Sequence, residues 1–522
     1  MSDTRCLCAQ ILRTRVALGI LAVSFLALTA CDAKGPVANK AFMSVDASLP
    51  TNHNTEAYDR IVDNPFQLVS QSPLSTFSSD VDTASYSNVR RFLLQEGKLP
   101  PKDAVRIEEM INYFTYDYPA PAGNHPVAIT PELTACPWNP KHRLLRIGVQ
   151  TAKIDPREMP SRNLVFLVDV SGSMAAPNRL PLLKQSLSLL VDQLSEGDRV
   201  SIVVYAGRAG LELPATPGHE KARIKAVIGR LEASGSTNGG EGIVLAYRLA
   251  QENFIAGGVN RVIIGTDGDF NVGVTNQGDL TRLIEEKRKS GVFLTVLGFG
   301  MGNLKDSTLE KLAHYGNGHY AYIDSLDEAR RLFVEQGAAL TTVAKDVKFQ
   351  VEFNPTHVAA YRLIGYENRI LAHQDFNNDQ KDAGDMGSGH TCTALYELVP
   401  AGEKIDVPGI DPLKYQQIKP AGQAQSDEWL TIKLRYKDPD AEVSKLLTVP
   451  VKGADLREQP SPDCAFASAV AAFGMILRDS PYKENAKLDA VAEAAAANIG
   501  DDPGGHRAEF GKLIQKTGRL KK

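Results

Sequence analysis

The chain contains 522 residues and carries a formal net charge of −4; 43% of its residues are hydrophobic and 23% are charged. This composition is that of a soluble globular protein, and the length predicts two or three domains. The slightly negative charge excludes the strongly basic surface that nucleic-acid-binding proteins need, so we expect no nucleic-acid partner.

Residues 1–30 are predicted to be a lipoprotein signal peptide. The first fifteen residues contain three arginines, and residues 16–28 form an apolar stretch. The stretch ends in Leu28-Thr29-Ala30-Cys31, which resembles a bacterial lipobox, where the cysteine is lipidated and becomes the first residue of the mature chain. A transmembrane anchor and an ordinary secretory signal are the alternatives, but the apolar stretch is short for a membrane span.

The lipobox implies a protein that is anchored by lipid on Cys31 in the bacterial cell envelope and faces the periplasm. Asp32 resembles the inner-membrane retention signal of enterobacterial lipoproteins, and the outer membrane is the alternative. Residues 31–64 are rich in small and polar residues without periodicity, which predicts a flexible tether. The cysteines beyond the tether, which form either one disulfide and one thiol or three buried thiols, are Cys136, Cys392 and Cys464.

Residues 65–161 are predicted to form an N-terminal flanking region of helices followed by strands. Helices are expected to begin near Asp82 and Arg106. Asp80 and Asp82 form an acidic pair that could bind a metal, but helix capping is the simpler interpretation. Within residues 127–152 apolar and polar residues alternate, which is typical of half-buried strands.

Residues 162–340 are predicted to form a domain in which apolar strands alternate with amphipathic helices. This rhythm predicts an α/β fold with a doubly wound, mainly parallel sheet that is covered by helices on both faces. The expected elements are 163–168, 180–194, 199–205, 220–231, 240–253, 261–266, 280–290, 292–298, 304–315, 319–323 and 326–336.

Residues 341–522 are predicted to form a C-terminal domain of strands followed by helices. The strands predict a β-sandwich-like layer that joins residues 127–152, so the central domain would be an insert between two halves of one β module. A long apolar helix at 465–477 is too short to span a membrane and is expected to be buried. The other expected elements are strands at 347–353, 359–363, 391–398 and 429–436, and helices at 484–498 and 507–520.

Oxygen-bearing side chains gather at strand ends in the central domain. Asp169 ends the first strand, and Ser171 and Ser173 follow it at alternate positions. Thr237 lies in a glycine-rich loop, and Asp267 ends another apolar strand. Open α/β sheets bind ligands at the carboxyl edge of their strands, and hydroxyl and carboxylate oxygens suit a hard cation such as Mg²⁺. A D-x-S-x-S sequence alone is explained better by helix capping than by metal binding.

Together these five residues resemble the metal-ion-dependent adhesion site of a von Willebrand factor type A domain, and none of its positions is missing. The resemblance implies a Rossmann-like central domain that binds Mg²⁺ or Mn²⁺. It implies direct binding by Ser171 and Ser173, direct or water-mediated binding by Thr237, and mostly water-mediated binding by the two aspartates. The segments that resemble the YfbK-type family of bacterial lipoproteins, over nearly all of the mature chain, are 77–86, 136–140, 361–369 and 473–481.

An ion that is bound directly by neutral hydroxyls stays electrophilic toward one more oxygen. The implied function is therefore an envelope protein that uses the cation to bind a protein partner presenting a carboxylate. A metal-independent structural scaffold of the cell envelope is the alternative, and a metal-dependent hydrolase is the third. The sequence has no P-loop and no G-x-S-x-G elbow, and residues 298–302 indicate a glycine turn rather than a dinucleotide loop. We therefore predict no enzyme and no nucleotide cofactor.

Overall fold

The computed structural model describes residues 54–522 except 236–238, 269–276, 406, 408–410, 412–413 and 416–420. The predicted signal peptide, Cys31 and Thr237 therefore lie outside the described residues. Within the described residues, no helix has the length and apolarity that a membrane crossing requires.

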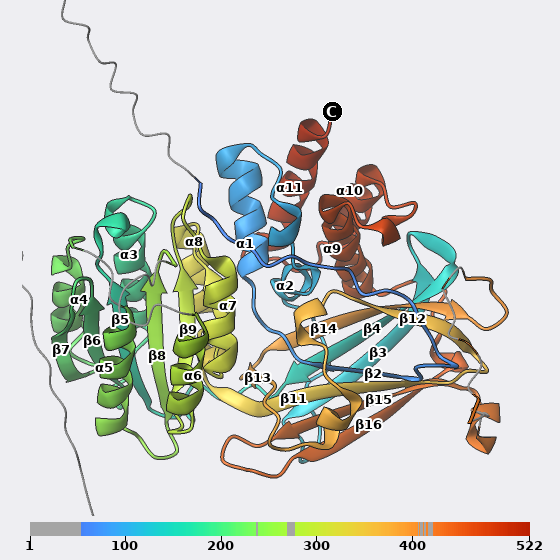
Figure 1. Cartoon of the computed structure of the whole chain (residues 1–522), viewed down its shortest axis with the longest axis horizontal. Helices are drawn as coiled ribbons and strands as arrows, with labels where there is room; N and C mark the ends of the chain where they lie inside the picture. The colour runs from blue at the N-terminus through green and yellow to red at the C-terminus, as the bar shows by residue number, and fades with distance from the viewer. Residues whose placement is uncertain are drawn as a thin grey trace, which may run out of the picture. The chain divides into compact units, whose positions relative to one another are not determined.

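The central domain is built on a sheet whose strand order is β10-β9-β8-β5-β6-β7 (Figure 1). All neighbouring strands are parallel except β7, which runs antiparallel to β6 at one edge. The sequence pattern missed β7 because Pro214 and Pro217 interrupt it, and proline is tolerated at sheet edges. The strands are β5 Arg162–Asp169, β6 Arg199–Tyr205, β7 Ala209–Pro217, β8 Val259–Thr266, β9 Phe293–Gly298 and β10 Tyr320–Tyr322.

Helices cover both faces of this sheet, as the alternating pattern predicts. Leu164 and Phe166 of β5 share a core with α3, α4 and α8, whereas Val165 and Leu167 share a core with α5, α6 and α7. Because successive side chains of a strand point to opposite faces, a strand buried on both sides is apolar throughout. The helices are α3 Leu180–Asp192, α4 Lys221–Arg230, α5 Gly239–Glu252, α6 Gln277–Arg288, α7 Asp306–Tyr315 and α8 Leu326–Arg330, which η4 Arg331–Glu335 continues.

Strands from before and after the central domain form a single β-sandwich. One sheet has the order β1-β12-β14-β4-β3, and the other has the order β13-β11-β15-β16, with β2 also paired to β11. Strand β4 precedes the central domain and pairs with β14, which follows it; the predicted insertion is therefore present. The strands are β1 Gln67–Leu68, β2 Leu74–Ser78, β3 Val127–Cys136, β4 Asn139–Thr151, β11 Thr342–Phe353, β12 Val358–Ile364, β13 Gly384–Gly387, β14 Thr391–Pro400, β15 Glu428–Lys437 and β16 Lys445–Lys452.

A helical layer packs on the outer face of the β4–β14 sheet (Figure 1). The buried helix predicted at 465–477 is confirmed as α9. The prediction that helices come first within residues 65–161 is wrong in part, because β2 pairs with β11 and Phe77 stacks on Phe349 at 4.8 Å. The helices are α1 Ala84–Arg90, continued by η1 Arg91–Glu96, α2 Ile107–Asn112, α9 Pro462–Arg478, α10 Leu488–Ala497 and α11 His506–Leu520.

Residues 54–64, which the sequence assigns to the tether, contact the folded body. The backbone N–H of Ile61 donates to Asp103 Oδ1 at 2.9 Å, and Asn64 Nδ2 donates to the carbonyl of Gly365 at 2.8 Å. Residues 54–64 therefore belong to the folded body, and the predicted tether boundary at residue 64 is corrected. The sequence did not indicate this contact, because hydrogen bonds between a side chain and the backbone leave no periodic pattern in a sequence.

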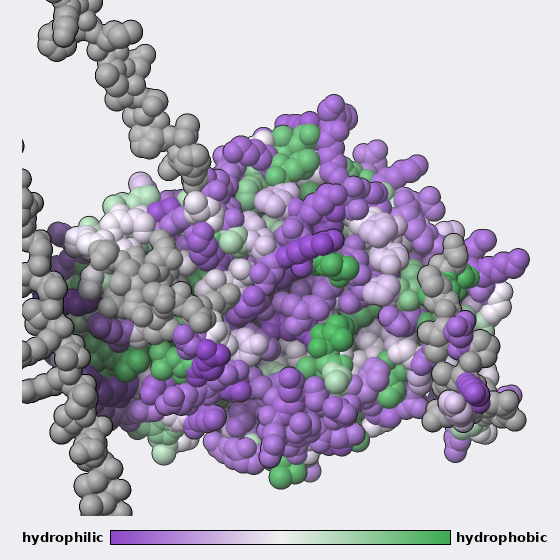
Figure 2. Space-filling view, in the orientation of Figure 1, coloured by the Kyte–Doolittle hydropathy of each residue, from purple (hydrophilic) through white to green (hydrophobic). Residues whose placement is uncertain are grey.

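The surface of the described residues carries little continuous apolar area on the face drawn in Figure 2, where apolar side chains are scattered among hydrophilic ones. The three cysteines beyond the tether are buried free thiols, which is the second of the two alternatives that their number leaves open.

Candidate metal centre

The candidate site lies at the carboxyl ends of β5 and β8. From β5 the chain continues outward through β6 and β7 and then returns to β8 on the other side of β5. The crevice between β5 and β8 is therefore the topological switch point of the sheet, where open α/β folds bind ligands. Asp169 is the last residue of β5, and Asp267 directly follows β8.

The D-x-S-x-S loop folds back on its own aspartate. The backbone N–H of Ser171 donates to Asp169 Oδ1 at 2.9 Å. Ser171 is buried, whereas Ser173 is exposed, and their Oγ atoms lie 3.0 Å apart. The loop therefore presents two hydroxyl oxygens side by side above a buried carboxylate, with one of them facing solvent.

Asp169 is held rigidly beneath these hydroxyls. Its Oδ2 accepts hydrogen bonds from Thr266 Oγ1 at 3.0 Å and from the Tyr205 hydroxyl at 3.3 Å. Burial raises the pKa of Asp169 to about 6, and the charge of Asp267 adds to this rise, while hydrogen bonds from Ser171 and Thr266 oppose it. A cation nearby favours the charged form of a buried carboxyl such as that of Asp169.

Asp267 is held by two residues that the sequence did not single out, Arg179 and Asn303. Asn303 Nδ2 donates to Asp267 Oδ2 at 2.8 Å, and Arg179 Nη1 forms an ion pair with the same oxygen at 3.1 Å. Arg179 also donates to the carbonyls of Ser173 at 2.5 Å and Met301 at 2.9 Å. The signal available in the sequence is the position of Arg179, directly before α3 and next to the D-x-S-x-S loop.

Thr237 itself lies outside the described residues, but its glycine-rich loop begins against the D-x-S-x-S loop. The carbonyl of Gly235 accepts a hydrogen bond from the backbone N–H of Gly172 at 3.0 Å. The backbone N–H of Ser234 donates to the carbonyl of Val170 at 2.7 Å. The structure thus brings the described residues Asp169, Ser171, Ser173 and Asp267 to one edge, and the loop of the fifth starts beside them.

Residues 298–302 form the glycine turn that the sequence indicates. Gly300 and Gly302 have φ angles of +77° and +90°, a region that favours glycine. A Cβ atom on Gly300 would lie 2.3 Å from Arg179 Nε. Glycine at position 300 therefore permits the close approach of Arg179, which links this turn to the D-x-S-x-S loop.

The residues present fit a small hard cation. An octahedral ion with bonds of about 2.1 Å places neighbouring ligand oxygens about 3.0 Å apart, which matches the separation of the Ser171 and Ser173 hydroxyls. All the side chains of the predicted set offer oxygen, and two of them are carboxylates. The arrangement can thus bind a cation such as Mg²⁺ and leave its exposed side toward solvent at Ser173.

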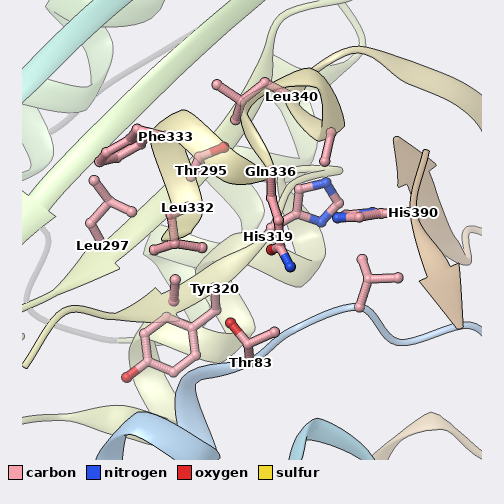
Figure 3. Close-up of a pocket in the computed structure, with 13 residues that line it drawn as sticks. Thr83, Thr295, Leu297, His319, Tyr320, Leu332, Phe333, Gln336, Leu340 and His390 are labelled. Carbon is pink, nitrogen blue, oxygen red and sulfur yellow. The ribbon is translucent and has the colours of Figure 1, made fainter. Parts of the chain in front are cut away.

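Two other polar clusters lie outside this site. Figure 3 shows His319 and His390 on the wall of a cavity of about 50 Å³, which has room for water molecules only. Burial lowers the pKa of His390 to about 4 and that of His319 well below its usual value. These histidines are half-buried by surface area and neutral at physiological pH, and the cavity is too small for a ligand larger than water.

The second cluster is the acidic pair Asp80 and Asp82, for which helix capping is wrong. Helix α1 has Thr83 as its N-cap, without a side-chain capping hydrogen bond. Instead Arg369 donates to Asp80 Oδ2 and to Asp82 Oδ2, each at 2.9 Å. Both carboxylates are buried, so their charges required a partner that the sequence separates from them by almost 300 residues. The Arg369 guanidinium therefore pairs with both carboxylates.

Comparison with known proteins covers almost the whole chain. A von Willebrand factor model matches residues 52–146, the von Willebrand factor type A domain matches residues 163–335, and the C-terminal domain of the uncharacterized protein YfbK matches residues 338–520. The uncharacterized protein YfbK of Escherichia coli (strain K12) is 45% identical over 473 residues, which are 89% of this chain and 81% of that protein.

Other similarities are more distant. Inter-alpha-trypsin inhibitor heavy chain H4 of Homo sapiens is 27% identical over 187 residues, which are 34% of this chain and 19% of that protein. Among solved structures, a von Willebrand factor type A protein from Catenulispora acidiphila aligns with 72% of this chain and 87% of its own, at 17% identity and a TM-score of 0.41.

Proposed function

Because this chain belongs to the YfbK family of bacterial proteins with a von Willebrand factor type A domain, we propose that it binds a partner protein through a divalent cation. The proposed ligand set is Asp169, Ser171, Ser173, Thr237 and Asp267. The observation that supports it best is the 3.0 Å separation of the two serine hydroxyls directly above the buried Asp169 carboxylate. Mg²⁺ is the proposed ion, and Mn²⁺ is the alternative with the same ligand preference.

The chain's own residues explain why such an ion would bind a partner. Ser171 and Ser173 contribute neutral hydroxyls, and Asp169 is already occupied by donors from Thr266, Tyr205 and the Ser171 backbone. A bound cation would supply positive charge at the solvent-facing side of the loop. A carboxylate on an exposed loop of the partner is the group that complements this charge.

Binding is favoured over hydrolysis because the carboxylates at the site are already engaged. A hydrolytic metal site needs a general base or a second metal beside the ion. Among the described residues, Asp169 accepts three hydrogen bonds, and Asp267 is paired with Asn303 and Arg179. A metal-independent scaffold is the second candidate, because the same hydrogen bonds also stabilise the loops themselves.

Partner capture with and without chelator tests the proposal. The bait is the chain from residue 32, immobilised and exposed to envelope extract in Mg²⁺ or in EDTA. Proteins that elute with EDTA and rebind in Mg²⁺ support the proposal. Thr237→Ala should weaken capture, because loss of a metal ligand or its support typically costs about 10–100-fold in affinity, while the circular-dichroism melt should barely move. Capture that is indifferent to EDTA would favour the scaffold.

We also propose that the protein is held in the bacterial envelope by lipid on Cys31. The support is the leader sequence alone, in which Leu28-Thr29-Ala30 precedes the cysteine. A diacylglyceryl cysteine carries the two acyl chains that stable anchoring needs. Metabolic labelling with a palmitate analogue should mark the wild-type chain and not Cys31→Ser. Label retained by that variant would place the lipid elsewhere.

A further inference from the structure

The loop that carries Asn303 also contacts the first described residues of the chain. We call residues 300–305 the rim loop and residues 54–58 the N-terminal segment. The backbone N–H of Thr55 donates to the carbonyl of Gly302 at 2.7 Å, and that of Ala57 donates to the carbonyl of Leu304 at 3.0 Å. These bonds at alternate residues resemble one edge of a β ladder, and Lys305 Nζ adds a bond to the carbonyl of Thr55.

Glu56 ties the same two segments together with its side chain. Its Oε1 accepts hydrogen bonds from the backbone N–H of Gly302 at 2.7 Å and from Arg91 Nη1 at 2.9 Å. Its Oε2 accepts from Arg91 Nη2 at 3.0 Å and from the Tyr58 hydroxyl at 2.9 Å. The side chain is only 3% exposed, so its charge and its four hydrogen bonds are buried in the contact.

On its opposite side the rim loop reaches the candidate metal site. Asn303 donates to Asp267 Oδ2, and Arg179 binds the carbonyl of Met301 and the Asn303 side chain. The turn after Asp267 also packs on the loop, since a Cβ on Gly268 would lie 2.6 Å from the Lys305 backbone nitrogen. The rim loop therefore lies between the N-terminal segment and Asp267 of the proposed ligand set.

The rim loop has little apolar anchoring at its tip. Met301 is 42% exposed, and it lies between two glycines that adopt left-handed backbone conformations. Glycine in such a turn gains no stability from side-chain packing and loses more conformational entropy than other residues on ordering. The Gly300 end of the loop is fixed by Arg179 and by the Tyr322 hydroxyl, which donates to the carbonyl of Gly300 at 2.6 Å, and Leu304 is buried in the core. Between these points the Gly302 end is held by hydrogen bonds from the N-terminal segment.

We propose that the N-terminal segment positions the rim loop and thereby sets the cation affinity of the metal site, with Glu56 as the positioning residue. The predicted change in Mg²⁺ affinity rests on the proposed function. The predicted change in deuterium exchange of the rim loop rests only on the contacts described above. Loss of the segment would free the Gly302 end of the loop. Asn303 and Arg179 would then no longer fix Asp267, and the site would bind Mg²⁺ more weakly.

The test uses the chain from residue 32 and three variants. Glu56→Ala removes the acceptor of the Gly302 N–H, whereas Glu56→Gln keeps an amide oxygen that can accept it. Asp63→Ala is the matched control, because Asp63 also pairs with a buried arginine, Arg478 at 2.5 Å, but contacts the C-terminal helices instead of the rim loop. Mg²⁺ affinity is measured by calorimetry, and deuterium exchange of residues 300–305 is measured without metal.

We expect Glu56→Ala to weaken Mg²⁺ binding about 10-fold, as for lost outer partners of metal ligands, and to increase exchange in the rim loop. Glu56→Gln should recover most of the affinity, and Asp63→Ala should leave affinity and rim-loop exchange unchanged even where its melting temperature falls. Equal affinity and exchange in Glu56→Ala and Asp63→Ala would overturn the proposal.

The test distinguishes failure of the proposed function from failure of this inference. If the wild-type chain does not bind Mg²⁺, the proposed function fails, while rim-loop exchange still decides whether the segment positions the loop. If Glu56→Ala does not fold, Thr55→Pro replaces it, because this change removes the N–H that donates to Gly302 and leaves the buried Arg91 pair intact. Unchanged rim-loop exchange in Thr55→Pro would also overturn the proposal.

Discussion

Ser171→Ala should remove most of the stabilisation that Mg²⁺ gives to the chain. The Ser171 hydroxyl is buried 3.0 Å from that of Ser173, and loss of such an oxygen weakens metal binding by about 10–100-fold. At an ion concentration about 100 times the wild-type Kd, binding stabilises the folded state by about 2.7 kcal/mol. With a 100-fold weaker site the same concentration equals Kd, and the stabilisation falls to RT ln 2, about 0.4 kcal/mol.

Thermal melts in Mg²⁺ and in EDTA measure this difference directly. The metal-free melting temperature should change little, because one lost hydroxyl pair costs about 1 kcal/mol. Ser186→Ala is the control: its buried hydroxyl donates to the carbonyl of Leu182 at 2.8 Å within α3, away from the site, so its Mg²⁺ shift should equal that of wild type. A full Mg²⁺ shift in Ser171→Ala would refute the assignment of the site.

Three further changes test the surrounding structure. Gly300→Ala should cost about 1–2 kcal/mol in backbone strain and push Arg179 away, so calorimetry should show weaker Mg²⁺ binding than in Gly302→Ala, whose new Cβ meets open space. Arg369→Met should cost about 3–5 kcal/mol in denaturant unfolding, because two buried carboxylates lose their partner. Glu108→Gln should flatten the dependence of melting temperature on pH. Burial, aided by neighbouring carboxylates, raises the pKa of Glu108 from 4.5 to about 8, so the stability of the wild type falls as pH rises through that interval. The variant should therefore be more stable than the wild type above pH 8.

The central domain was predictable because its signals are local. A strand buried on both faces is an apolar run, and each helix shows its buried stripe, so β5, β6, β8 and β9 are confirmed near their predicted bounds. Strand β2 was not predicted, because five residues are too few to show the alternation of apolar and polar side chains. Strand β7 was not predicted, because prolines interrupt its alternation of apolar and polar side chains. Both strands are specified by the neighbours they pair with, Phe349 among them, rather than by their own sequence.

The site shows the same division between local and distant information. The order Asp169, Ser171, Ser173 is a local pattern, and the strand end at Asp267 predicted its convergence with that loop. Arg179 and Asn303 join the site through contacts between three loops, which only the packed fold defines. The arginine that neutralises Asp80 and Asp82 is hidden for the same reason.

The N-terminal segment also determines how a mechanical load would pass through the molecule. In a chain anchored through Cys31, tension from a captured partner would enter at the metal site and leave at residue 54. The shortest route runs across the rim loop and through the backbone bonds of Thr55 and Ala57. The β-sandwich and the C-terminal helices would lie off this route and stay unstrained. The hydrogen bond from the Gly302 N–H to Glu56 would share this force, and the strength of the contact between the rim loop and the N-terminal segment would limit the pull that the attachment withstands.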